Sequence, residues 1–189
     1  MRHIVFVLFV SMAGFSFAQN AVQEGEDDRT SNSDFKIGYS GSIEAGYDIG
    51  ITSFWSPGFG MDREKIEIIN GLRLTPFISL GVGTGLHYYF DFDNKKTWVP
   101  IFINMKVNFT EKRLSPILSL SGGYSFDFNN NFENVGFLVN SFIGVKYKIW
   151  SKFSLNTGVG LEMQKIECFL WNEPAYFNAM TLNIGLSFN

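Results

Sequence analysis

From Phe35 onward, apolar side chains recur at every second position of the chain. In residues 35–49 the odd positions are mostly aromatic or aliphatic, and the even positions are mostly polar or glycine. Successive side chains of a β-strand point to opposite sides, so a period of two indicates a strand with one apolar face. The pattern predicts eight strands, at residues 35–49, 65–74, 77–92, 98–109, 116–128, 136–149, 153–165 and 176–188.

The second of these strands is the least regular, because Asn70 falls on its apolar face and Ile69 on its polar face. Elsewhere a repeat supports the assignment. RLTPFISLGVGTG, which begins at Arg73, returns as RLSPILSLSGG from Arg113 and more weakly as KFSLNTGVG from Lys152. Each copy is expected to start a strand that leaves a short turn, where proline is tolerated because the first residue of a strand need not donate to the ladder.

Short and long connections alternate along the chain. Those at 75–76, 110–115 and 150–152 are short, and those at 50–64, 93–97, 129–135 and 166–175 are longer. Such alternation is expected when all the turns at one end of a barrel are short and all the loops at the other end are long. The sequence therefore predicts an all-β fold, an eight-stranded antiparallel up-and-down β-barrel.

The size of the side chains on the two faces indicates which face looks inward. The apolar face carries several large residues in each strand, whereas the polar face is rich in glycine and serine. An eight-stranded barrel has room inside for few large side chains. We therefore expect the apolar face to contact lipid, rather than to fill a soluble lipocalin-like barrel. Aromatic residues near the strand ends would form two interfacial girdles: Tyr47, Tyr88, Phe90, Phe126, Phe128 and Phe137 near the loops, and Phe109, Tyr147, Phe153 and Phe188 near the turns.

The segments TPFISLGVGTG (75–85) and SPILSLSGGYSFDF (115–128), with Asn183, Gly185 and Phe188 in the last strand, resemble the small outer-membrane β-barrel family. This is the group of the OmpA transmembrane domain and OmpX, often labelled porin-like. The resemblance implies an outer-membrane location in a Gram-negative cell, contact with lipid and lipopolysaccharide, and a C-terminal signal read by the barrel-assembly machinery. The family's signal usually ends on its aromatic residue, whereas this chain continues to Asn189.

The N-terminus has the features of an export signal. A short basic start precedes the apolar run Ile4 to Val10, and Ser16-Phe17-Ala18 supplies small residues for cleavage after Ala18. A membrane anchor would need about twenty apolar residues. Residues 19–34 are polar and acidic, which predicts a flexible periplasmic spacer. The expected organisation is a signal peptide at 1–18, this spacer at 19–34 and the barrel at 35–189.

Composition narrows the range of partners. The formal net charge of −3 comes without a basic patch, which argues against nucleic acid. Cys168 is the only cysteine, so it cannot form an intramolecular disulfide. We expect no cofactor and no metal.

Charged residues on the inner face differ in sign along the barrel. Basic residues are expected near the short turns (Lys36, Arg73, Lys106, Lys146, Lys148), and acidic residues nearer the loops (Glu44, Asp48, Glu67, Asp91, Asp127, Glu162). Charges that face a barrel interior must be paired or hydrated. The predicted luminal network is Lys36, Glu44, Glu67, Arg73, His87, Lys106, Lys146 and Glu162. It would be either an ion-paired plug or the lining of a narrow or gated pore, and we favour the plug.

Two further features bear on function. Phe54, Trp55 and Phe59 in the first long loop could contact surface ligands, or they could pack on neighbouring loops and headgroups. His87 would suit a lipid A-modifying enzyme, but no serine follows at the His-x-Ser spacing of the deacylase PagL, and a PagP-like enzyme would need a hydrophobic lumen. The leading hypothesis is a non-enzymatic envelope protein with a structural or loop-mediated role.

Overall fold

The computed structural model describes residues 37–51, 58–59, 62–90, 96–166 and 175–188. Several predictions from the sequence lie outside the described residues: the signal peptide, the acidic spacer, Lys36, Phe54, Trp55, Asp91, Cys168 and Asn189. Of the described chain, no helix has the length and hydropathy needed to cross a bilayer.

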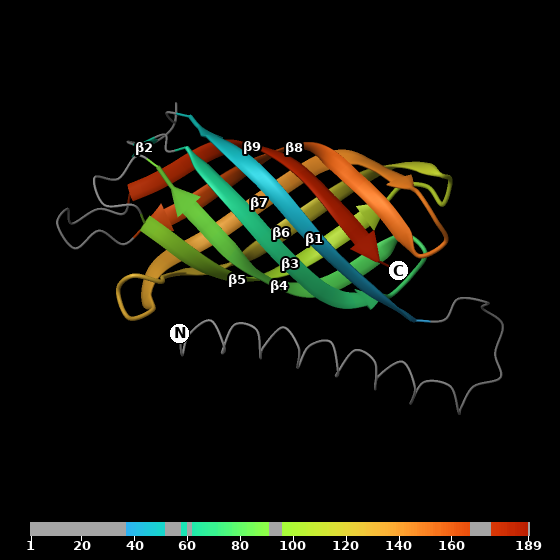
Figure 1. Ribbon diagram of the computed structural model, residues 1–189, viewed down its shortest axis with the longest axis horizontal. Coiled ribbons are helices and arrows are strands. Elements are labelled where there is room, and N and C mark those ends of the chain that lie inside the picture. The colour runs from blue at the N-terminus through green and yellow to red at the C-terminus, as the bar shows by residue number, and fades with distance from the viewer. Residues whose placement is uncertain (1–36, 52–57, 60–61, 91–95, 167–174, 189) are drawn as a thin grey trace.

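Eight long strands form a closed antiparallel barrel (Figure 1). They are β1 (Gly38–Gly50), β3 (Arg63–Arg73), β4 (Ile78–Tyr89), β5 (Lys96–Asn108), β6 (Leu114–Asp127), β7 (Glu133–Lys148), β8 (Phe153–Ile166) and β9 (Ala175–Phe188). Each strand pairs with its sequence neighbour in the barrel, and the pairing of β1 with β9 closes the ring. The predicted architecture is confirmed, with every strand near its expected place.

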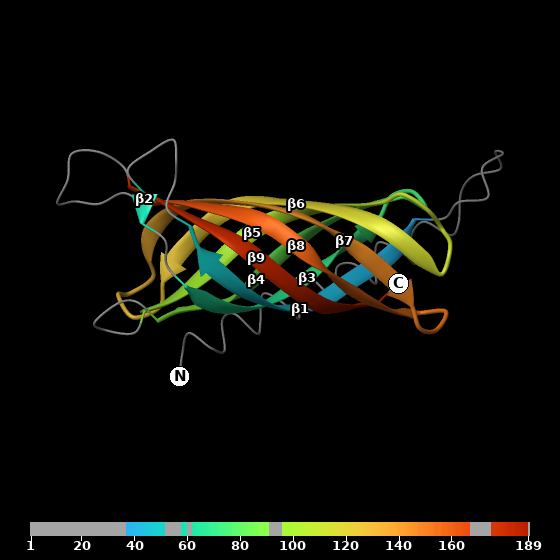
Figure 2. The same cartoon turned by 90° about the horizontal axis from the view of Figure 1, so that it is seen from above.

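Residues 50–64 were predicted to form a loop, but part of this segment is a strand. It contains the short strand β2 (Gly58–Phe59), which pairs in parallel with Tyr176 and Phe177 of β9. The tight turns gather at one end of the barrel, and β2 and the connection between β6 and β7 lie at the other (Figure 2). The two ends of the barrel therefore differ in structure.

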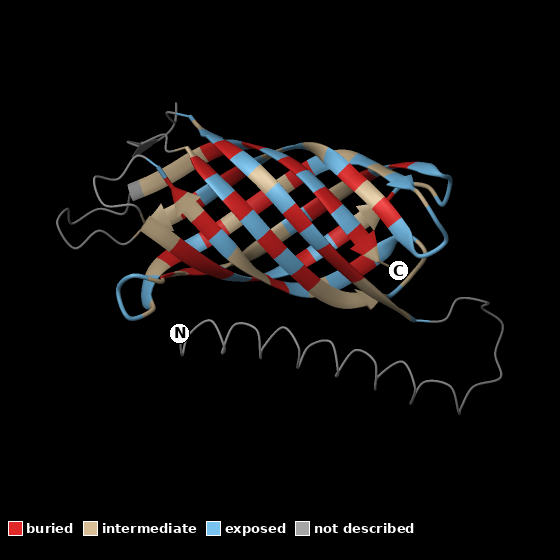
Figure 3. Cartoon of the chain, in the orientation of Figure 1, coloured by how far each residue is buried: buried red, intermediate tan, exposed pale blue. Residues whose placement is uncertain are grey.

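Buried and exposed positions alternate along the strands (Figure 3). Leu80, Ile103 and Leu182 are 45%, 60% and 46% exposed, whereas Gly83 is buried. The outward direction of the apolar face is therefore confirmed. Since this wall is apolar around the ring, water is a poor solvent for it and lipid a good one.

Aromatic side chains gather at both ends of the outer surface, as predicted. At the long-loop end, the rings of Tyr88 and Phe90 lie 5.2 Å apart, and those of Tyr124 and Phe137 lie 5.4 Å apart. At the turn end, the ring of Phe153 contacts both Trp150 and Phe188. These positions suit the two polar interfaces of a membrane.

The irregular strand β3 keeps a single facing throughout. Ile69 is buried, in phase with Lys65 and Glu67, and Asn70 is on the outer side. The Tyr39 hydroxyl donates a hydrogen bond of 2.7 Å to Asn70 Oδ1. This bond satisfies a polar atom that would otherwise be costly on an apolar wall.

Prolines occupy places other than the strand starts predicted from the repeat. Pro76 precedes β4, but Pro116 is the third residue of β6. Pro100 lies inside β5, where the β4–β5 register passes from Thr84↔Ile101 to His87↔Trp98 without a pair between them. A proline has no N–H to donate to the ladder, so a gap at this point is expected.

Candidate functional site

A neutral cluster of four charged side chains occupies the half of the lumen nearer the long loops. Asp48 comes from β1, Arg63 and Lys65 from β3, and Glu162 from β8. Lys65 Nζ lies 2.7 Å from Glu162 Oε2 and 3.1 Å from Asp48 Oδ1, and Arg63 forms ion pairs with both acids. All four side chains are buried. Two acids thus balance two bases where water is excluded.

The contact between β3 and β8 crosses the lumen, since β1 and β9 lie between these strands in the barrel order. Asn140 Nδ2 donates to Glu162 Oε2 at 2.8 Å, and Arg63 donates to the Tyr89 hydroxyl. Glu162 is therefore the centre of a network that links five strands: β3, β7 and β8 directly, and β1 and β4 through Arg63. Such a network holds these strands at fixed separations.

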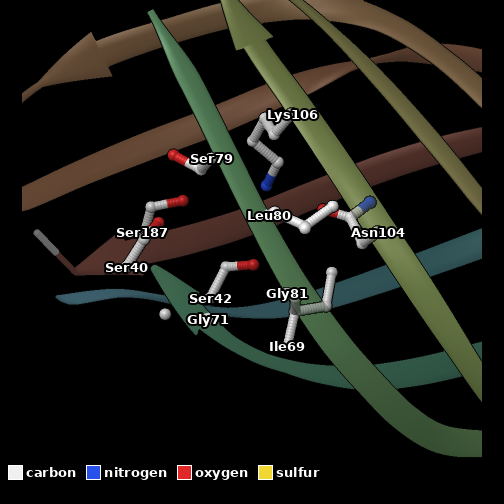
Figure 4. A pocket seen from close by; sticks show the side chains of 11 residues that line it. Ser40, Ser42, Ile69, Gly71, Ser79, Leu80, Gly81, Asn104, Lys106 and Ser187 are labelled. Carbon is white, nitrogen blue, oxygen red and sulfur yellow. The ribbon is translucent and has the colours of Figure 1, made fainter. Parts of the chain in front are cut away.

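A second ion pair crosses the lumen nearer the short turns. Lys106 Nζ of β5 lies 2.6 Å from Glu44 Oε1 of β1, and Ser42 Oγ donates to the same oxygen at 2.9 Å. β3 and β4 separate these two strands in the barrel order. Around Lys106 is a cavity of about 20 Å³, lined by small polar side chains such as Ser42, Ser79 and Asn104 (Figure 4). That volume suits about one water molecule.

His87 lies inside the barrel, fully buried, and its Nε2 is 2.9 Å from Glu67 Oε1. Both residues belong to the predicted network, and their pairing follows from neighbouring positions on β3 and β4. This imidazole is therefore enclosed on the inner side of the barrel wall.

Aromatic rings fill the remaining width of the lumen. Phe102 of β5 is paired across the ladders with Gly83 and Gly123, and a Cβ on Gly83 would collide with its ring. Trp98 of β5 stacks on Phe177 of β9, on the opposite side of the barrel, with ring centroids 6.3 Å apart. The inner face, predicted to be rich in glycine and serine, thus also carries large buried rings. Gly83 is needed because the Phe102 ring lies over it.

The predicted luminal residues divide into two groups. Glu44 with Lys106, Glu67 with His87, and Glu162 with β3 are joined by ion pairs or hydrogen bonds. Arg73 and Lys146 instead line a separate cavity at the short-turn end.

The expected separation of charge by sign is incomplete, since Arg63 and Lys65 lie among the acids. Neither residue was included in the predicted network, because that strand was expected to start at residue 65 and had an uncertain facing. They have the same parity as Glu67 and Arg73, which face inward. That parity was the signal that could have identified them.

The other predicted contact residues are only partly described. Phe59 belongs to β2, paired with β9. In β9, Asn183 is buried, Gly185 packs against Glu44, and the Phe188 ring contacts Phe153 at the turn end. Whether Asn183, Gly185 and Phe188 act as an assembly signal stays a prediction.

No family model and no curated protein sequence matches this chain. Among solved structures, it is similar to Neisserial surface protein A (NspA), with 13% identity, a TM-score of 0.59, and coverage of 82% of this chain and 99% of that chain. The N-terminal β-barrel domain of Pseudomonas aeruginosa OprF matches at 17% identity and a TM-score of 0.46, covering 79% and 96%. The outer membrane enzyme PagL matches at 12% identity and a TM-score of 0.49, covering 76% and 97%. The chain thus has the fold of the small eight-stranded outer-membrane β-barrels.

Proposed function

We propose that this chain is an integral outer-membrane protein with a closed lumen, and that its role in the envelope is structural or carried by its long loops. The observation that carries this proposal is the set of contacts across the lumen. Lys65–Glu162, Lys106–Glu44 and Trp98–Phe177 each join strands that are not neighbours in the barrel. The first and third lie in the half of the lumen nearer the long loops and the second nearer the short turns, so together they obstruct the axis in both halves of the barrel.

The chemistry of these contacts supports a permanent plug. A pore needs water along its axis, whereas the charged groups here are satisfied by one another. Removal of one member of a buried pair leaves an uncompensated charge, so the pairs resist opening. The luminal cavity beside Lys106 holds about 20 Å³, the size of one water molecule.

A membrane location is supported by the apolar outer wall and by the aromatic side chains at both of its ends. We expect the protein to fractionate with outer membranes and to migrate on gels in a heat-modifiable manner. Hydrophobic photolabelling should mark Leu80, Ile103 and Leu182 and leave luminal positions unlabelled. Recovery in the soluble periplasmic fraction would contradict the proposal.

Conductance tests the closed lumen directly. Folded protein in planar bilayers should show no stable unit conductance under conditions in which a known porin conducts. The variant Lys65→Ala/Glu162→Ala removes one of the crossing pairs and serves as the matched comparison. A reproducible unit conductance from the unmodified protein would instead favour the narrow-pore alternative.

A non-enzymatic role is supported by the place of His87, which is buried in the lumen beside Glu67 and cannot meet a lipid. Mass spectrometry of lipid A from cells with and without the gene tests this part of the proposal. Identical lipid A spectra are expected. A change that depends on the gene, and that disappears with His87→Ala, would assign the protein to the lipid-modifying enzymes.

A further inference from the structure

A second cavity lies at the short-turn end of the barrel, where the ends of β3, β5, β6, β7 and β8 meet the tight turns. Its volume is about 280 Å³, more than ten times that of the luminal cavity beside Lys106. The lining consists of charged and hydroxyl-bearing side chains and the amide of Asn108, with Pro76 as the one apolar residue. A polar ligand therefore suits this cavity better than an apolar one.

Positive charge dominates the cavity. Arg73, Lys112, Lys146 and Lys148 line it, and Glu111 is the one acidic residue among the side chains that do so. In the described part of the chain, no carboxylate oxygen lies within 4.0 Å of the amine of Lys112 or Lys148. The ion-paired cluster around Glu162 is neutral by contrast. An excess of cations around one cavity attracts an anion.

Buried polar groups add hydrogen-bonding capacity to the charge. Asn108 is 7% exposed, lines the cavity, and has no hydrogen-bond partner for its Oδ1 among the described residues. Rotation of this amide by half a turn would present its NH₂ group at the same place. Ser154, also buried, adds a hydroxyl. A buried polar atom without a partner points to a ligand or a water molecule in the cavity.

We propose that this cavity binds a phosphate group. A phosphate monoester carries a charge of about −1.5 to −2 and three acceptor oxygens, whereas a carboxylate carries a single charge. The planar guanidinium of Arg73 can contact two of those oxygens, and the lysines act as point charges. The volume exceeds that of phosphate alone, so the cavity also has room for part of the molecule that bears the group.

Two sources can supply this chemistry. One is a soluble phosphate or phosphorylated solute, and the other is the headgroup of a phospholipid in the adjoining leaflet. Exposed aromatic side chains on the turns, such as Phe77, Phe109 and Trp150, place the cavity at the level of the membrane interface. Both sources are therefore present at the level of the cavity.

The experiment uses the full mature protein, refolded in a non-ionic detergent free of phosphate. Inorganic phosphate and glycerol 3-phosphate are titrated by calorimetry, with chloride at equal ionic strength as the reference. In a second arm, the protein is extracted from phosphatidylglycerol nanodiscs, and retained lipid is counted by native mass spectrometry. Saturable binding of one phosphate, or retention of one lipid, is the expected result, and the arm that responds identifies the source.

Two matched variants locate the site. Lys148→Gln removes an exposed charge that lines the cavity, and Lys152→Gln removes an exposed charge at the same end that does not line it. The double variant Lys146→Gln/Lys148→Gln should bind about tenfold more weakly or lose the lipid, because hydrogen bonds to charged groups are the strong ones. Lys152→Gln should stay within about twofold of the parent.

Equal losses in the Lys148→Gln and Lys152→Gln proteins would overturn the proposal, because they would indicate a general charge effect. Absence of saturable binding in both arms would do so too. If the double variant does not fold, the comparison of Lys148→Gln with Lys152→Gln still tests the proposal. Of these two lysines, only Lys148 lines the cavity, so only its substitution should weaken binding. The cavity lies apart from the contacts across the lumen, so the conductance result and the phosphate result can fail independently.

Discussion

The two ends of the barrel interior differ in their charge balance: one is neutral and the other has an excess of basic residues. Near the long loops, Asp48 and Glu162 are balanced by Arg63 and Lys65, and all four side chains are buried. At the short turns, the basic residues around the cavity outnumber Glu111. Apart from Glu111 and Lys112, which lie in a turn, both groups are on the same polar face of the strands. What separates them is access to water.

Burial accounts for this difference. Deep in the lumen a charge loses its hydration, so each one must meet an opposite charge and further hydrogen bonds. At the open end, Lys112 and Lys148 remain exposed and keep their hydration. A neutral cluster is therefore suited to hold strands together, and the basic cavity is suited to attract an anion. Three pairs of substitutions and one single substitution test this contrast, each through the free energy of unfolding by urea in phospholipid vesicles.

The largest effect is expected for Glu162→Ala. It leaves Arg63 and Lys65 buried with one acid in place of two, and removal of one partner from a buried pair costs about 3–5 kcal/mol. Glu64→Ala, which removes an exposed carboxylate on the outer face of β3, is the control and should change stability by less than about 0.5 kcal/mol. Similar losses in the two proteins would mean that the deep cluster contributes no special stability.

The outer wall should respond next most strongly. Leu120 is exposed in the middle of β6, and Leu120→Arg should cost about 2–4 kcal/mol if lipid surrounds that position. Leu114→Arg, at the turn end of the same strand, should cost at most about 1 kcal/mol because the arginine can reach the interface. A neutral Leu120→Arg would contradict the outward facing of the apolar side.

A smaller effect is expected at Gly83, which lies against the Phe102 ring in the lumen. Gly83→Ala places a methyl group against the Phe102 ring, and overpacking of this kind costs about 1–3 kcal/mol. Gly122→Ala is the control, because the nearest atoms to its new methyl group would be 3.9 Å away. Truncation of the ring with Phe102→Leu should recover part of the Gly83→Ala loss. If it does not, the glycine has a different role.

The smallest effect is expected at the basic cavity. Lys148→Gln should change the free energy of unfolding by less than about 0.5 kcal/mol, since the side chain is exposed and has no described acid beside it. A slight stabilisation would agree with relief of repulsion from Lys146. A loss of stability comparable to that of Glu162→Ala would show that charges at the two ends contribute equally to stability.

The local pattern predicted most of the fold. Alternation with a period of two residues identified all eight long strands within about three residues, and the sizes of the side chains on each face indicated which side meets lipid. Both signals are local, because a strand's two faces follow from its own residues. The pattern was weakest at Ile69 and Asn70, where a bond to Tyr39 on the neighbouring strand satisfies the outward polar side chain.

The candidate site was harder to predict. The sequence placed Glu44, Lys106 and Glu162 inside the barrel but could not say which partners they meet. Their partners come from strands far along the chain, 62 residues apart for Glu44 and Lys106 and 97 residues apart for Lys65 and Glu162. Arg63 and Lys65 were left out of the predicted network because the start and the facing of one strand, β3, were uncertain.

By itself, the sequence determined the number of strands, their direction along the chain and the face that each turns to lipid, since these depend on alternation and on turn length. Only the tertiary structure decided which charges neutralise one another and which remain around an open cavity. The reason is geometric: closure of the ring sets the stagger between strands and brings β3 near β8 and β1 near β5. No stretch of adjacent residues contains that information.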